Sequence, residues 1–171
     1  PDDPRVPQVE QPSYAMPAGF DEAALAERLT RAEQAIAAQK PQEAVDLLMV
    51  PASQPSVDPR VRLLYGKALL HAGQASLAIW PLERAATGRP ADSEEAFLHA
   101  QALLAGGDPL TARRVLDRLL EETPGNQRLL RLRARANRAA LDLEAAIRDL
   151  ETVIGLAPDD LGLRSEEHTS E

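Results

Sequence analysis

Four arginines near the carboxyl end of the chain have the spacing of a single helical face. They are separated by three, four and three residues, and they are Arg128, Arg131, Arg135 and Arg138. In an α-helix these intervals bring side chains to the same side. A guanidinium group can donate two parallel hydrogen bonds to a carboxylate and tolerates partial burial. The stripe is therefore a candidate site for an acidic peptide segment or another carboxylate. The alternative is that these arginines pair with carboxylates of neighbouring helices, including Asp149 or those of a missing fifth unit.

The remaining reactive side chains do not have the arrangement of a catalytic or metal site. His71 and His99 lie in different segments without metal-ligand spacing, and the pairs Glu94-Glu95 and Glu121-Glu122 are typical of solvated helix ends. The sequence has no phosphate-binding glycine loop and no serine in a nucleophile elbow. With no cysteine, it also has no thiol nucleophile and no Cys-ligated metal. We therefore expect no enzymatic activity, no metal and no cofactor.

Composition favours a helical domain. The chain has 171 residues, enough for one domain, and 44% of them are hydrophobic but only 3% aromatic. Alanine and leucine supply most of the apolar side chains, which suits closely packed helices better than a sheet. The net charge of −8 disfavours nucleic acid as a partner. No apolar run approaches the roughly eighteen residues that span a bilayer. The absence of cysteine is compatible with a bacterial cytoplasm and equally with the periplasm or envelope.

The apolar pattern repeats at an interval of thirty-four residues. Helix-length apolar segments alternate with turn signals such as Gly106-Gly107-Asp108-Pro109, and Asp58 and Asp108 have the position of N-caps. Asp92 or Ser93 begins the third unit, with Asp92 and Glu95 as a capping-box pair. Three columns of residues recur: Ala44, Ala78, Ala112 and Ala146; Leu48, Leu82, Leu116 and Leu150; and Ala32, Gly66, Ala100 and Ala134. Because one helical pair cannot bury its own apolar stripe, we expect stacked pairs with a continuous core.

The two ends differ from this pattern. Residues 1–19 are rich in proline and predict a disordered lead-in. The repeats occupy residues 21–160, and residues 161–163 have the pattern of the start of a truncated fifth repeat. Residues 164–171 resemble a translated sequencing adapter, and we interpret them as an artefactual tail.

The period, the helix-turn-helix pattern and the marker residues together resemble the tetratricopeptide repeat (TPR) family. With Pro59, Ser93 and Gln127 as first positions, the family's small eighth residue falls on the Gly66 column, and its closing proline on Pro90, Pro124 and Pro158. The family's early tryptophan is absent, and leucine replaces the aromatic residue that is common at position twenty-four. The resemblance implies an all-α, right-handed solenoid of four repeats at about 25–58, 59–92, 93–126 and 127–160.

The resemblance also implies which residues face a ligand, because the first helix of each TPR unit lines a concave groove. The expected groove residues are Arg60, Lys67, His71, Phe97, Gln101, Arg128, Arg131, Arg135 and Arg138. The groove would then be basic at one end and apolar around Phe97. The lysine and asparagine of the family's two-carboxylate clamp are absent, since Leu29 and Glu33, or Leu63 and Lys67, stand at those positions. Recognition of chaperone C-termini is therefore not expected.

The function that follows from the resemblance is that of a protein–protein interaction scaffold, which binds a partner peptide or helix. Two other interpretations stay open: the substrate-recruiting segment of a larger, truncated enzyme, and a structural spacer in a bacterial envelope assembly. The last helix is expected to expose an apolar face around Leu150, Val153 and Ile154. Self-association through this face is a further expectation.

Overall fold

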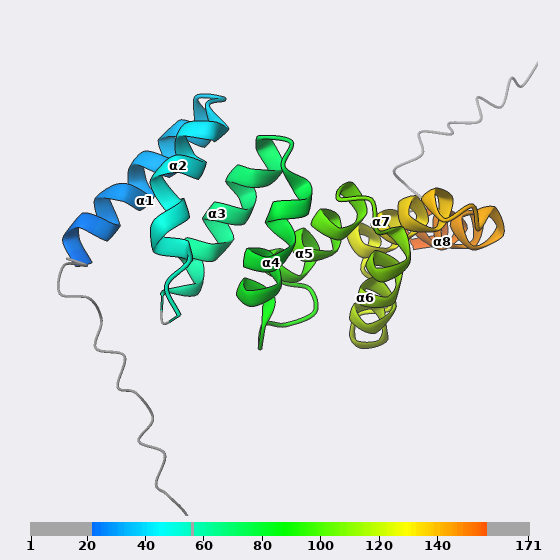
Figure 1. Ribbon diagram of the computed structural model, residues 1–171. Helices are drawn as coiled ribbons and strands as arrows, with labels where there is room; N and C mark the ends of the chain where they lie inside the picture. Colours follow the sequence, from blue (N-terminus) through cyan, green and yellow to red (C-terminus); the bar gives the residue numbers. More distant parts are fainter. Residues whose placement is uncertain (1–21, 56, 157–171) are drawn as a thin grey trace, which may run out of the picture.

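The computed structural model describes residues 22–55 and 57–156, and these residues form eight α-helices and no strand (Figure 1). The helices are α1 (Glu22–Ala37), α2 (Pro41–Ala52), α3 (Pro59–His71), α4 (Ala75–Ala86), α5 (Glu94–Ala105), α6 (Pro109–Glu122), α7 (Gln127–Ala139) and α8 (Leu143–Leu156). Each helix packs on the next along the chain, and α1, α3, α5 and α7 also contact one another in a row. The predicted all-α solenoid is confirmed. The lead-in at 1–19, the repeat start at 161–163 and the tail at 164–171 lie outside the described residues.

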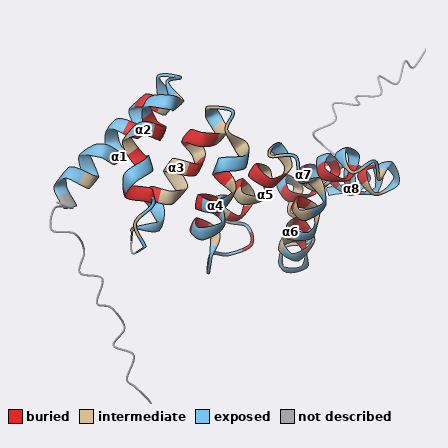
Figure 2. Cartoon of the chain, viewed as in Figure 1, coloured by how far each residue is buried: buried red, intermediate tan, exposed pale blue. Residues whose placement is uncertain are grey.

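The recurring columns of the sequence form the core. Ala44, Ala78 and Ala112 are each 0% exposed, and so are Leu48, Leu82 and Leu116. Figure 2 shows the buried positions gathered on the helix sides that face neighbouring helices. Since each unit presents the same residues to its neighbours, one packing arrangement is repeated along the solenoid.

Gly66 allows α3 and α4 to approach closely. A Cβ atom at this position would lie 2.6 Å from Cδ2 of the buried Leu82. The other units carry alanine in this column, so the second unit combines the smallest residue with a leucine that fills the space.

The turn inside each helical pair has the same backbone in all four units. One residue per turn has a positive φ: 59° at Gln39, 73° at Gly73, 90° at Gly107 and 63° at Leu141. The residue after it donates its backbone N–H to a carbonyl oxygen of the preceding helix at 2.8 to 3.0 Å. These donors are Lys40, Gln74, Asp108 and Asp142. This pattern is a helix C-cap in the left-handed conformation, for which glycine is preferred. The repeat thus imposes the conformation even where the residue is glutamine or leucine.

Side chains cap the N-termini of several helices. Asp58 accepts a hydrogen bond from the N–H of Arg60 at 2.9 Å, and Asp108 accepts one from Thr111 at 3.0 Å, as predicted. The predicted capping box of Asp92 and Glu95 is wrong. Ser93 is the N-cap and accepts from the N–H of Ala96 at 3.3 Å, while Glu95 pairs with Arg89 at 3.3 Å. With Ser93 as the cap, Glu95 comes one residue too early to reach back to the cap backbone.

The last helix exposes an apolar stripe whose membership differs from the prediction. Val153 is 6% exposed because it packs into the core around α6 and α7. The exposed residues are spaced by four, three and four, which places them on one side of α8: Leu143, Ile147, Leu150 and Ile154. Leu150 is 46% exposed, whereas its counterparts in the three earlier units are fully buried. In the part of the chain that the structure describes, no helix covers this face.

We expect this stripe to mediate self-association of the chain. Light scattering over a concentration series should show a mass that rises above 18.5 kDa for the unmodified chain. Ile147→Glu combined with Leu150→Glu should keep the protein monomeric, because both side chains are about half exposed and neither substitution opens the core. Leu77→Glu, at an exposed leucine of α4, is the control and should leave the association unchanged. If the unmodified chain stays monomeric at every concentration, this prediction is contradicted.

Candidate functional site

The four predicted arginines lie on the exposed side of α7. The side chain of Asn126 caps this helix and accepts hydrogen bonds from the N–H groups of Arg128 and Leu129 at 3.1 and 3.2 Å. The opposite side of the helix is held in the core by Leu129, Leu130, Leu132 and Ala136, all buried. Arg128, Arg131, Arg135 and Arg138 are exposed. Anchoring one side of α7 therefore fixes the direction of the arginine stripe on the other.

Phe97 connects the stripe to the neighbouring unit. The guanidinium carbon of Arg128 lies 3.6 Å from the centroid of the Phe97 ring, which is within the range of a cation–π interaction. Phe97 belongs to α5 and Arg128 to α7, so this contact spans two first helices of the solenoid. The contact orders one guanidinium and leaves its N–H edges available for hydrogen bonds.

A shallow hollow of about 390 Å³ joins these residues. Its lining combines an aromatic ring, a leucine and three guanidinium groups: Phe97, Gln127, Arg128, Arg131, Leu132 and Arg135. Four of the predicted groove residues are thus brought together. Arg138 lies one helical turn beyond Arg135, outside this lining.

Neighbouring carboxylates do not neutralise the stripe. Within residues 22–55 and 57–156, no ion pair joins a carboxylate to Arg128, Arg131, Arg135 or Arg138. Arg131 donates a hydrogen bond to the amide oxygen of Gln127 at 3.5 Å. The interpretation that these arginines pair with acidic residues of adjacent helices does not hold among the described residues.

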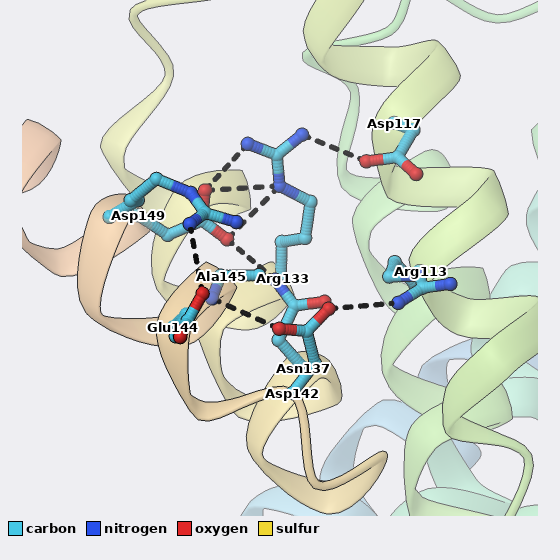
Figure 3. A network of polar contacts seen from close by, with 9 residues as sticks. Arg113, Asp117, Arg133, Asn137, Asp142, Glu144, Ala145 and Asp149 are labelled. Carbon is cyan, nitrogen blue, oxygen red and sulfur yellow. Dashed lines mark hydrogen bonds and ion pairs between the residues drawn. The ribbon is translucent and has the colours of Figure 1, made fainter.

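Asp149 is instead bound by Arg133, which points to the other side of α7 (Figure 3). The Nε atom of Arg133 donates to both carboxylate oxygens of Asp149 at 3.2 and 3.1 Å, and Nη1 donates to Asp117 at 2.8 Å. Asn137 donates to Asp149 at 3.0 Å. The hydrogen bond from Arg133 to Asp149 is the main cause that raises the pKa of the guanidinium. Sequence reasoning missed this cluster, which ties α6, α7 and α8 together.

A second hollow, of about 230 Å³, lies between α3 and α5. Its lining is Lys67, Leu70, His71, Leu98 and Gln101, so three more predicted groove residues are brought together. Lys67 is already paired, because its ammonium group lies 2.9 Å from Oε2 of Glu94. Arg60 is exposed at the start of α3 and lines neither hollow.

The described residues hold no cluster of three or more His, Asp or Glu side chains that could bind a metal ion. His71 is the last residue of α3 and is exposed. His99 is partly buried, and burial lowers its pKa. None of the helices between residues 22 and 156 is long and apolar enough to cross a bilayer.

Comparison with solved structures shows the same architecture in other proteins. YrrB, described as a TPR protein with an unusual peptide-binding site, superposes with a TM-score of 0.71 at 20% identity and covers 81% of this chain and 72% of its own. The fold is a TPR solenoid. MamA from Desulfovibrio magneticus RS-1, residues 41 to the end, shares the TPR-type arrangement with a TM-score of 0.68 at 21% identity, over 82% of this chain and 78% of its own. No protein-family model and no curated protein sequence matches the chain.

Proposed function

We propose that this TPR solenoid is a protein-interaction scaffold. It binds an acidic peptide segment on the face formed by the first helix of each repeat (α1, α3, α5 and α7), here called the first-helix face. The arginine stripe of α7 is the main contact. The observation that carries the proposal is the contrast within α7. Arg133 has two carboxylate partners, whereas the stripe arginines have none among the described residues. Exposed guanidinium groups beside an aromatic ring and a leucine can bind a carboxylate and an adjacent apolar side chain together.

Charge and fold both support a peptide over other anionic partners. The protein carries a net charge of −8, so an extended polyanion such as nucleic acid would be repelled outside the stripe. In a short peptide the acidic residues contact the stripe alone and avoid that repulsion. The structural likeness to YrrB, which is described as having a peptide-binding site, supports peptide binding as a use of this fold.

The test is binding of a fluorescein-labelled peptide in which aspartate and glutamate flank one leucine, followed by fluorescence anisotropy. Arg131→Ala combined with Arg135→Ala should weaken binding about tenfold, since each exposed guanidinium–carboxylate contact contributes about 0.7 kcal/mol. The double variant should also show a flatter dependence of affinity on salt, because fewer charge pairs are screened. Both side chains are exposed, so we expect the fold to be unchanged.

Arg84→Ala combined with Arg148→Ala is the matched control. It removes the same charge from exposed positions on second helices, α4 and α8, and should change the affinity less than twofold. An equal loss in both double variants would mean that net charge alone attracts the peptide. Unchanged binding by the α7 variant, or tighter binding of a single-stranded oligonucleotide than of the peptide, would overturn the proposed function.

A further inference from the structure

The two hollows on the first-helix face share α5 but differ in their available charge. Phe97 of α5 lines the hollow with the arginine stripe, whereas Leu98 and Gln101 of the same helix line the hollow with Lys67. At the α7 end the guanidinium groups have no carboxylate partner among the described residues. At the α3 end the cation is Lys67, and it is bound by Glu94. A ligand that covers both hollows therefore meets two different environments.

Glu94 forms an ion pair with the ammonium group of Lys67. Its carboxylate lies 2.9 Å from the Lys67 ammonium group and connects α5 to α3. Glu94 is the first residue of α5, where the positive end of the helix dipole favours a carboxylate. Since Glu94 is attached to the same chain, a peptide carboxylate must compete with a group that is always present at high local concentration. The rest of the lining around Lys67 contains no carboxylate: Leu70, His71, Leu98 and Gln101.

We propose that Glu94 is a specificity-determining residue, an internal carboxylate that prevents acidic residues of a peptide from binding at the α3 end of the groove. The groove then accepts a segment with an acidic block at one end only, followed by apolar or uncharged residues over α3 and α5. This inference rests on the proposed function, because it concerns the same face. It adds the order of acidic and uncharged residues along the bound peptide.

The test compares two peptides on the unmodified protein and on Glu94→Gln. One peptide has a single acidic block followed by leucine and glutamine residues, and the other repeats the acidic block at its far end. Each is also made in reversed order, so that either chain direction is sampled. On the unmodified protein the second block should change the dissociation constant less than twofold. On Glu94→Gln it should tighten binding about threefold to fivefold, the range of an exposed ion pair.

Two further variants show where the gain comes from. Glu95→Gln removes the same charge from the same turn of α5, but Glu95 pairs with Arg89 and not with Lys67. This control should give no gain from the second block. Lys67→Gln combined with Glu94→Gln should lose the gain, because the ammonium group that binds the second block is removed.

Three outcomes would overturn the inference. If the unmodified protein already gains as much from the second block as Glu94→Gln does, Glu94 does not exclude carboxylates. If the single-block peptide binds through Arg131 and Arg135 but Glu94→Gln behaves like Glu95→Gln, the inference fails while the proposed function stands. If neither peptide binds the unmodified protein, the proposed function fails and the inference fails with it.

Discussion

Replacing Arg133 with methionine should lower the free energy of unfolding by about 3 kcal/mol, because it leaves a buried carboxylate without its charge partner. Asp149 is only 4% exposed, and Arg133 provides most of its hydrogen bonds. Methionine keeps the apolar stem of the side chain, so the loss reports the charge and not the packing. Urea denaturation followed by circular dichroism at equilibrium measures the change.

Two companion variants separate this effect from a general sensitivity of α7. Arg131→Met, two residues away on the exposed side, should change the unfolding free energy by less than about 0.5 kcal/mol. Arg133→Met combined with Asp149→Leu should recover part of the loss, since it leaves no unpaired buried charge. The recovery is incomplete because the buried amide of Asn137 loses its acceptor. A loss for Arg133→Met no larger than that for Arg131→Met would contradict a stabilising role for the cluster.

Leu116→Ala should cost about 3 kcal/mol of unfolding free energy, whereas Leu150→Ala should cost about 1 kcal/mol. The two leucines occupy the same position of successive repeats, but Leu116 is 0% exposed and Leu150 is 46% exposed. The chemistry of the two substitutions is identical, so the difference measures only what covers the side chain. The same urea titrations measure both.

The contrast also tests the uncovered state of the α8 face. Leu82→Ala, at the equivalent buried position of the second unit, is a further control and should resemble Leu116→Ala. These titrations are run at concentrations where the chain is monomeric, so that self-association does not cover the stripe. If Leu150→Ala were then as costly as Leu116→Ala, the stripe on α8 would have to be buried within the single chain. Hydrogen exchange of the α8 amides would then show protection similar to that of α6.

The fold was largely predictable because the repeat fixes the register of every helix. Asp58 and Asp108 mark helix starts by their chemistry, and Gly73 and Gly107 mark the turns. Gln39 and Leu141 adopt the same left-handed conformation, but nothing about glutamine or leucine indicates it. Only the interval of thirty-four residues connects them with the glycines. The local identity of a residue and its backbone conformation can therefore disagree where tertiary packing decides.

The candidate site was predictable as a helical face but not as a set of contacts. The spacing of Arg128, Arg131 and Arg135 places them together, because helical periodicity depends on sequence alone. The stacking of Arg128 on Phe97 and the pairing of Lys67 with Glu94 depend on how neighbouring units pack, which spacing does not specify.

The sequence indicates only weakly that Arg133, Asn137, Asp117 and Asp149 form a cluster. Arg133 and Asn137 are four residues apart, so they share a face of α7 outside the arginine stripe. Arg133 lies sixteen residues from each of its partners, Asp117 and Asp149, and this interval is close to half the repeat. Such a pair can be recognised only once the repeat has shown which helix faces meet.

The most direct test of peptide binding by the α7 stripe is nuclear magnetic resonance of the arginine Nε–Hε groups during titration with the acidic peptide. The signals of Arg128, Arg131 and Arg135 should shift with a common dissociation constant, while those of Arg133 and Arg148 stay in place. Arg133 is bound by Asp117 and Asp149, and Arg148 lies exposed on α8 beside Glu144, so both serve as controls in the same spectrum. Shifts confined to arginines outside the stripe, or no shift at saturating peptide, would contradict the assignment of this face as the binding site.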